Sequence, residues 1–442
     1  MRFRGHLRVI QDGDQKIFLL YSRLFSLFRQ AGVPNRFVLV RHESSATLPT
    51  IQDVRSRLKN LVGAQKFWSV EAEDRSKLAT QLPSSQEELA PRRSADSRQQ
   101  VVIPLATNEP LREKYINFFK GIRFGRILED LDTFAVWISY QHNKDPNGGE
   151  GKKSALSIVT ALVDRIVMHE QFIHPDCDIR MTGNVTWTGK TSMEVTMQLE
   201  QLRMEKWHQM LDACFVMVAR DPINKGSAFV HPVVPETEED KALFQLGESH
   251  KKQRKDQTLQ SLFRQPPTAE ERQYIHDIFL STLNSKSVSF RDRVKPDNTL
   301  WLEETILKNV IICHPENRNL YSKMFGGFLM RQAFELGWSN ACLYCKSRPF
   351  IEAVDDIMFR GPVEVGSLLF MSSEVVYTKD QYLQVRVHAE VVDPKTGEHE
   401  TTNIFHFTFS SPQPFPKVMP RTYAESMLYL SGKRHFESAV GK

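Results

Sequence analysis

The chain has 442 residues, of which 40% are hydrophobic and 25% charged, and its formal net charge at pH 7 is +5. This balance is typical of a globular protein with two or three domains, and the mild charge, with no basic stripe carrying interleaved aromatic residues, argues against a nucleic-acid partner. No run of about 18 apolar residues occurs, so the sequence predicts no membrane span. The five scattered cysteines argue against a disulfide framework and favour a reducing compartment.

Residues 1–50 are basic and amphipathic, and we interpret them as a mitochondrial transit segment. Eight lysines and arginines in this stretch face only Asp12, Asp14 and Glu43. The apolar residues between Ile17 and Phe28 fall on one helical face. Such an acid-poor amphipathic start is the signature of transit peptides. An ordinary surface helix is the alternative, and the acids at Asp12 and Asp14 favour it.

Residues 51–99 are polar and mixed, and they predict a short helix followed by a linker. Residues 100–235 then predict a domain that opens with a brief strand at 101–105. A long helix follows, because Ile127, Leu128, Leu131, Phe134 and Ile138 recur at helical spacing. Four strand-like runs come next, near 155–166, 178–188, 192–203 and 212–220.

Residues 236–289 are highly charged and predict a solvated linker helix. Residues 290–412 predict a second domain with a long helix, on which Ala333, Gly337 and Ala341 are spaced four apart. Strands are expected near 349–359, 367–378, 381–392 and 401–410. Residues 413–442 form a proline-punctuated tail with a closing helix near 423–430.

The two predicted domains repeat each other. The segment VDRI at 163–166 is echoed by VDDI at 354–357, and VTWT at 185–188 by VVYT at 375–378. The spacing stays at about 190 residues, far too long for a solenoid repeat. We therefore predict an α+β fold of two tandem copies, each a long helix wrapped by a curved antiparallel sheet. The contact between the copies is where a ligand site is expected.

Most common catalytic signatures are missing from the sequence. It contains no Gly-x-Ser-x-Gly, no HExxH, no Walker loop and no Gly-x-Gly-x-x-Gly before a helix. Cys342 and Cys345 form a lone pair, which predicts packing at a helix end, and no metal site is expected. Asp132 is the candidate catalytic group, because a carboxylate on an apolar helix is costly unless it is hydrogen-bonded or functional. An Asp that merely meets a backbone donor is the structural alternative.

Several segments resemble the double hot-dog acyl-CoA thioesterases, and most of all a mitochondrial branch of that family. In the first copy they are GRILEDLDTFA (125–135), VTALVDRI (159–166) and TSMEV (191–195). In the second copy they are HPENRN (314–319), FGGFL (325–329), AVDDIMFRGP (353–362) and VG (365–366). The resemblance covers about three quarters of the chain. It implies two hot-dog domains with joined sheets, assembly into homo-oligomers such as trimers of these double units, and hydrolysis of acyl-CoA in the mitochondrial matrix with no added cofactor.

The resemblance also implies a site shared between the copies. Asp132 would act as general base, and the backbone N–H groups at Gly326 and Gly327 would polarise the thioester carbonyl. Lys323 stands where relatives often carry asparagine, so polar support is expected from Asn319 or Ser322. The residues expected to contact the coenzyme A phosphates are Arg165, Lys190, Lys323 and Lys379.

The second, symmetric site looks altered. Arg126 occupies the position taken for the second glycine of the first copy, and Glu335 is offset by one from the carboxylate position. One working site per chain is therefore expected. An acyl-CoA-binding protein without hydrolysis is the main alternative. A hydratase would need a histidine close before Gly125 or Gly326, and neither glycine has one.

Overall fold

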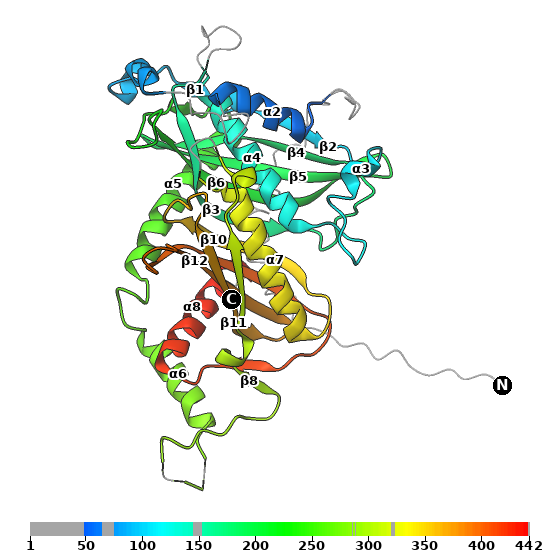
Figure 1. The fold of residues 1–442 in the computed structure, drawn as a ribbon, viewed down its shortest axis with the longest axis vertical. Helices are drawn as coiled ribbons and strands as arrows, with labels where there is room; N and C mark the ends of the chain where they lie inside the picture. Colours follow the sequence, from blue (N-terminus) through cyan, green and yellow to red (C-terminus); the bar gives the residue numbers. More distant parts are fainter. Residues whose placement is uncertain are drawn as a thin grey trace, which may run out of the picture.

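The computed structural model describes residues 48–63, 75–144, 153–284, 286–287, 289–319 and 323–440. Within them, one 10-stranded sheet runs in the order β2-β4-β5-β6-β3-β10-β13-β12-β11-β9. The first half of this order comes from the first copy and the second half from the second copy (Figure 1). The predicted α+β fold of two joined hot-dog domains is confirmed. The proposed transit segment lies outside the described residues, apart from its last three positions.

In the first copy, helix α4 (Phe124–His142) lies across one face of its half-sheet. The apolar side chains that predicted this helix are fully buried, as their spacing requires. The strands are β2 (Gln99–Ile103), β3 (Ser157–Met168), β4 (Ile179–Thr188), β5 (Ser192–Arg203) and β6 (Lys206–Arg220). Strand β6 starts earlier than predicted because Met204 and Glu205 make a hairpin turn at positive φ, without the glycine or asparagine that usually signals such a turn.

In the second copy, helix α7 (Gly326–Cys345) covers its half-sheet in the same way. The strands are β9 (Leu307–Ile312), β10 (Phe350–Phe359), β11 (Leu368–Lys379), β12 (Tyr382–Val392) and β13 (His399–Ser410). Edge strand β9 was not predicted. Among the described residues it pairs with β11 alone, and its Val310 and Ile312 are about half exposed. The strand therefore lacks a clean alternation of buried and exposed residues.

The two copies join through the repeated segments themselves. Strand β3 pairs antiparallel with β10, and Ile166 lies opposite Val354 while Val163 lies opposite Ile357. The first residue of one motif thus faces the last residue of the other. This pairing relates the copies by a local twofold axis and makes the ten strands one sheet.

Helices α5 and α8 pack on the face of the sheet opposite α4 and α7 (Figure 1). The single predicted linker helix is wrong in detail, because the linker forms two helices, α5 (Glu238–Leu259) and α6 (Ala269–Ser281), separated by Pro266 and Pro267. Helix α8 (Tyr423–Val440) is longer than predicted. It continues through Gly432, where a Cβ would lie 2.6 Å from Val376 Cγ2.

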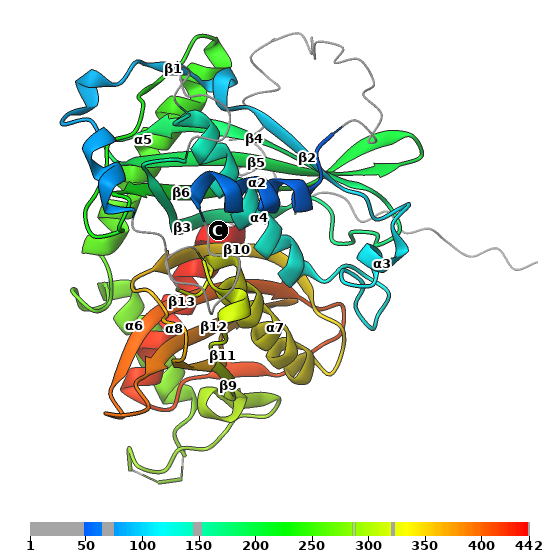
Figure 2. The ribbon, with the colours of Figure 1, turned by 45° about the horizontal axis from the view of Figure 1, so that its top comes forward.

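The predicted N-terminal helix is present as α2 (Ile51–Val62), which packs against α4 (Figure 2). The remaining short elements are α3 (Glu109–Arg112), β1 (Arg92–Arg93), β7 (Val233–Val234), β8 (Thr299–Trp301) and β14 (Lys417–Met419). All five cysteines are unpaired, and Cys345 is buried at the end of α7. Among the helices of the described ranges, none is both long and apolar enough to cross a membrane.

Candidate active site

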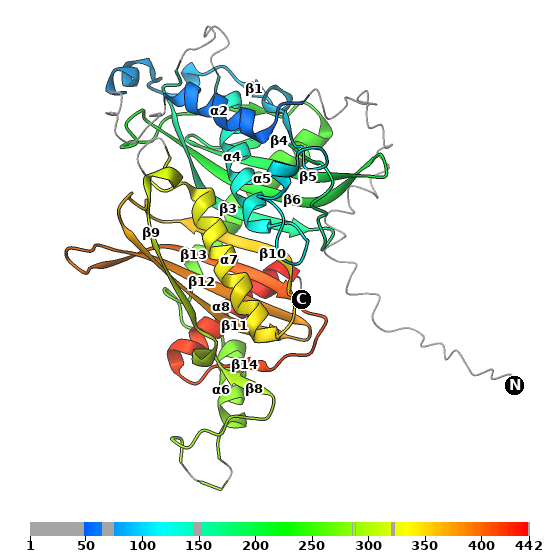
Figure 3. The ribbon, with the colours of Figure 1, turned by 45° about the vertical axis from the view of Figure 1, so that its right-hand side comes forward.

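Helices α4 and α7 contact each other where the copies meet (Figure 3). Each helix contributes one glycine to the contact. A Cβ on Gly327 would lie 2.9 Å from Glu129 Cα, and a Cβ on Gly125 would lie 3.0 Å from Arg331 Cγ. Any side chain at Gly327 would push the backbones apart. The two contacts mirror each other with a shift of 202 residues (327 minus 125, and 331 minus 129). This shift defines which residues of the two helices are equivalent.

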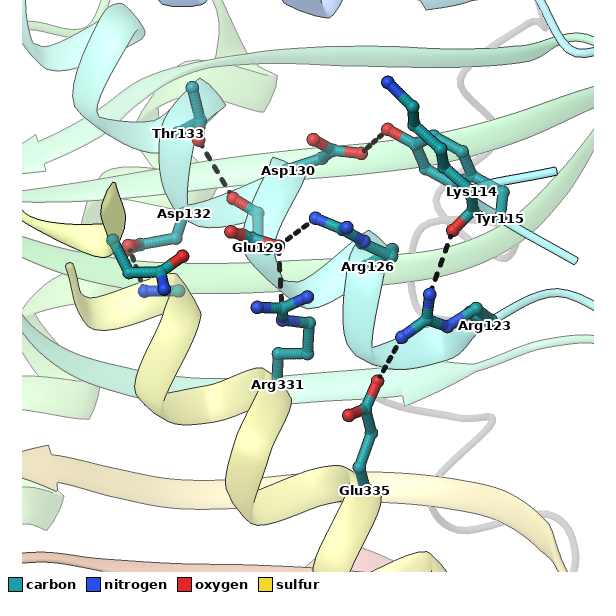
Figure 4. Close-up of polar contacts among 12 residues, drawn as sticks. Lys114, Tyr115, Arg123, Arg126, Glu129, Asp130, Asp132, Thr133, Arg331 and Glu335 are labelled. Carbon is teal, nitrogen blue, oxygen red and sulfur yellow. Dashed lines mark hydrogen bonds and ion pairs between the residues drawn. The ribbon is translucent and has the colours of Figure 1, made fainter. Parts of the chain in front are cut away.

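Asp132 lies on α4 and reaches across this contact to the start of α7 (Figure 4). Its side chain is completely buried. One carboxylate oxygen, Oδ2, accepts a hydrogen bond of 2.7 Å from the N–H of Gly327. The other, Oδ1, accepts a hydrogen bond of 2.5 Å from the Thr160 hydroxyl on β3. The structure thus brings the acid of the first copy together with the glycine pair of the second.

Three buried carboxylates follow one another on α4, but their partners differ. Glu129 lies 3.0 Å from an Arg126 nitrogen and 3.5 Å from Arg331 Nε (Figure 4). Asp130 forms a 2.7 Å ion pair with Arg55 of α2. Among the described residues, Asp132 forms no ion pair and is held by neutral donors alone. A buried carboxylate without a cation is expensive, and such an arrangement is common in catalytic sites.

Burial raises the pKa of Asp132 to about 6, while the hydrogen bonds from Thr160 and Gly327 act in the opposite direction. The start of α7 also favours negative charge, since the helix dipole is positive there. The group is therefore ionised near neutral pH and is still basic enough to accept a proton from water.

Replacing Thr160 with valine is expected to raise the pKa of Asp132 further. The substitution keeps the shape of the side chain and removes a hydrogen bond that stabilises the ionised carboxylate. The acidic limb of the pH–rate profile should shift to higher pH, while the rate at high pH changes less. Thr160→Ser, which retains the hydroxyl, serves as the control. An unmoved acidic limb in Thr160→Val would contradict this coupling.

The two glycines offer different donors. The N–H of Gly327 is occupied by Asp132. Within the described part of the chain, the N–H of Gly326 donates to no acceptor. Gly326 itself lies close to the acid, because its Cβ position would be 3.2 Å from Asp132 Oδ2. One N–H thus fixes the carboxylate, and the next is available to a ligand.

The loop before α7 holds two of the other predicted residues. Asn319 closes the loop on itself, because its Oδ1 accepts a hydrogen bond from the backbone N–H of Lys323. Lys323 forms an ion pair with Glu364, and burial lowers its pKa. Neither has a hydrogen bond to Asp132 among those described. Ser322 lies outside the described residues.

The residues predicted to contact phosphate are spread over the sheet. Lys190 is exposed in the β4–β5 turn, and the register from Met193 through Met217 to Thr160 places that turn at the active-site end of the sheet. Lys379 lies at the other end, in register with the start of β10. Arg165 donates to the carbonyl of Ala439 at the end of α8. Lys190 and Lys323 therefore share an end of the sheet with Asp132, and of these two Lys323 is already paired with Glu364.

The altered second site has to be assigned differently from the sequence-based expectation. The 202-residue shift makes Gly125, rather than Arg126, the equivalent of Gly327. It also makes Phe334 the equivalent of Asp132, whereas Glu335 forms a 2.8 Å ion pair with Arg123. The assignment of Arg126 was off by one residue, because the sequence comparison matched Gly125 with Gly326, whereas the helix contact matches Gly125 with Gly327. The expected offset of Glu335 by one residue agrees with the 202-residue shift.

Among the described residues, one group has metal-ligand chemistry, formed by Asp164, Cys214 and His250. Arg254 pairs with Asp164 at 2.8 Å, and its positive charge would oppose a cation there. The group lies where α5 packs on the sheet. It is separate from Asp132.

Thr160 was missed as a site residue by sequence reasoning. It lies within an apolar strand, and only the shape of the fold places its hydroxyl against Asp132. A threonine in such a strand is ordinary by β propensity. No local signal distinguishes it.

Two joined hot-dog domains, with a buried acid on one central helix that bonds to the glycine pair at the start of the other, define a double hot-dog protein. No family model matches the chain. It is 52% identical to human "Acyl-coenzyme A thioesterase 9, mitochondrial" over 394 residues, which are 88% of this chain and 89% of the human protein. It is 36% identical to "Acyl-coenzyme A thioesterase 4, mitochondrial" of Humulus lupulus over 74% of this chain and 62% of that protein. The chain belongs to the acyl-CoA thioesterase family, in its thioesterase 9 branch.

Solved structures match more distantly. An acyl-CoA hydrolase from Staphylococcus aureus, in complex with butyryl coenzyme A and coenzyme A, has a TM-score of 0.31 and 21% identity. The match covers 32% of this chain and 89% of the Staphylococcus aureus chain.

Proposed function

We propose that the chain hydrolyses fatty acyl-CoA to a free fatty acid and coenzyme A, with Asp132 as the general base. The observation that carries this proposal is the buried, cation-free carboxylate joined to Gly327 across the contact between the copies. Membership of the thioesterase family gives the substrate class.

The chemistry follows from these positions. The ionised Asp132 takes a proton from a water molecule, and the water oxygen attacks the thioester carbonyl carbon. The N–H of Gly326 stabilises the negative charge that develops on the carbonyl oxygen, while Gly327 keeps the base oriented. The carbon–sulfur bond then breaks, and the coenzyme A thiolate receives the proton held by Asp132. Water is the only co-substrate, and no added cofactor is required.

The other partners follow from the same reading. Lys190 is proposed to contact the coenzyme A phosphates, because it lies at the active-site end of the sheet. The other three candidates are weaker. Arg165 donates to the Ala439 carbonyl, Lys323 is paired with Glu364, and Lys379 lies at the other end of the sheet. The basic N-terminus and the mitochondrial relatives support a matrix location. We propose a homo-oligomer, such as a trimer of double units, to be tested by light scattering.

The reaction is expected to depend on pH through Asp132. The base must be deprotonated, and its pKa is raised to about 6. The value of kcat/KM should therefore fall about tenfold per unit of pH below about 6 and stay level above it. Initial rates of thiol release between about pH 5 and pH 8 measure this profile. A profile that is flat across this range would rule out a base with this pKa.

The direct test is thiol release from acyl-CoAs of several chain lengths by the purified full chain. Release that saturates with substrate supports hydrolysis. Tight binding without release would establish the alternative, an acyl-CoA-binding protein. Hydration of an unsaturated acyl-CoA without release would establish a hydratase.

A further inference from the structure

A cavity of about 220 Å³ opens at the end of the copy contact away from Asp132. Its lining includes Phe124, Gly125 and Phe334. Under the 202-residue shift these correspond to Gly326, Gly327 and Asp132. The cavity is therefore the counterpart of the active site, and we call it the second cleft.

The second cleft has a largely apolar lining and carries phenylalanine at the position that corresponds to Asp132. Phe334 replaces the carboxylate, and its ring lies 5.2 Å from that of Phe124. The neighbouring acid, Glu335, is neutralised by Arg123 at the cleft (Figure 4). Met168, Trp338 and Ile351 extend the apolar lining. Such a surface favours an apolar chain and has no base to activate water.

One cation in the lining has no acidic partner. The Arg348 guanidinium lies 5.5 Å, 5.3 Å and 5.3 Å from the ring centroids of Phe119, Phe172 and Phe350. Across the described residues, it forms no ion pair or hydrogen bond. Aromatic stacking holds the guanidinium in place while its N–H donors stay available. Arginine in this state is suited to a carboxylate or a phosphate.

We propose that the second cleft binds an acyl chain with an anionic head and does not hydrolyse it. The acyl chain of the ligand occupies the apolar cavity, and its anionic head contacts Arg348. The proposal rests on the proposed function for the identity of the acyl ligand. That ligand is either the released fatty acid, through its carboxylate, or a second acyl-CoA, through its phosphates.

The test uses the full chain and calorimetry with three probes, namely laurate, the non-hydrolysable thioether analogue of lauroyl-CoA, and free coenzyme A. Arg348→Gln removes the charge and keeps much of the stem. Arg264→Gln, at an exposed position of the linker, is the matched control. Met168→Trp fills the cavity and leaves Arg348 intact, so it tests the cleft even if Arg348→Gln fails to fold.

Arg348→Gln should weaken binding of laurate, or of a second equivalent of the thioether, by roughly 10- to 100-fold. Met168→Trp should do the same, Arg264→Gln should do nothing, and kcat/KM at low substrate should stay unchanged in all three. If Arg348→Gln and Met168→Trp lose laurate binding, the ligand of the second cleft is the fatty acid. If they lose the second equivalent of the thioether analogue, the ligand is acyl-CoA.

Three results would overturn the second cleft as an acyl site. The first is that the native chain binds one equivalent of the thioether analogue and no more, while laurate either binds equally to all variants or does not bind. The second is free coenzyme A that binds through Arg348 as tightly as the thioether analogue, since the acyl chain would then contribute nothing. The third is a changed oligomeric state in Arg348→Gln, which would make this surface a subunit contact. If the protein binds laurate through Arg348 but releases no thiol from acyl-CoA, the proposed hydrolysis is wrong and the second cleft still stands as an acyl site.

Discussion

Replacing Asp132 with asparagine is expected to lower kcat/KM for acyl-CoA by about 10²- to 10⁴-fold, the usual contribution of a general base. Asparagine has the same shape and can still accept the hydrogen bond from Gly327, but it cannot take a proton from water. Binding of the thioether analogue should be retained. Thiol release and calorimetry on the same preparation separate the two effects. Hydrolysis at the native rate would show that Asp132 is not the base.

The same substitution should stabilise the protein above pH 6. Burial raises the pKa of Asp132 from 3.8 in the unfolded chain to about 6 in the fold. The folded state therefore binds the extra proton between these values, and its stability falls as pH rises through them. The cost of the ionised form is on the order of 3 kcal/mol. Asp132→Asn should have the higher melting temperature at pH 8, and this advantage should disappear below about pH 4.

Asp130→Asn is the contrasting control on the same helix. It removes one partner of the buried Asp130–Arg55 ion pair and leaves Arg55 uncompensated. This variant should lose stability while keeping most of its kcat in the folded fraction. Equal loss of kcat in both variants would mean that general disturbance of α4, rather than the base, explains the effect of Asp132→Asn.

Replacing Gly327 with alanine is expected to impair both the fold and the reaction. The added Cβ would lie 2.9 Å from Glu129 Cα and 3.1 Å from Glu129 O, so α4 and α7 would have to separate. Overpacking of this kind costs about 1–3 kcal/mol. A shift on the order of 1 Å between Asp132 and the start of α7 should lower kcat about 10²-fold.

Denaturant unfolding and thiol release measure these two effects. Gly361→Ala is the matched control, because a Cβ there would meet only Glu400 Oε1, at an ordinary distance of 3.7 Å. Its stability and rate should remain close to those of the native chain. If Gly327→Ala were equally harmless, the close helix contact would not be what positions the site.

Much of the fold could be predicted because it rests on local patterns and on repetition. The apolar spacing on α4, the alternation in the central strands and the doubled VDRI and VDDI segments each reflect a buried surface that the sequence must encode. The predictions failed where a tertiary contact overrides a local signal. Gly432 continues α8 because it packs on Val376, and the β5–β6 turn uses Met204 and Glu205 at positive φ.

The sequence by itself determined the two copies, the acid at Asp132 and the glycine pair at Gly326 and Gly327. Only the tertiary structure decided which of three adjacent carboxylates lacks a cation, because Arg55 and Arg331 arrive from distant segments. It also decided that the Thr160 hydroxyl donates to Asp132 and that Phe334 occupies the position of Asp132 in the second copy. The physical reason is that the pKa and the partners of a buried carboxylate depend on the packing of two helices, and residue order does not encode that contact locally.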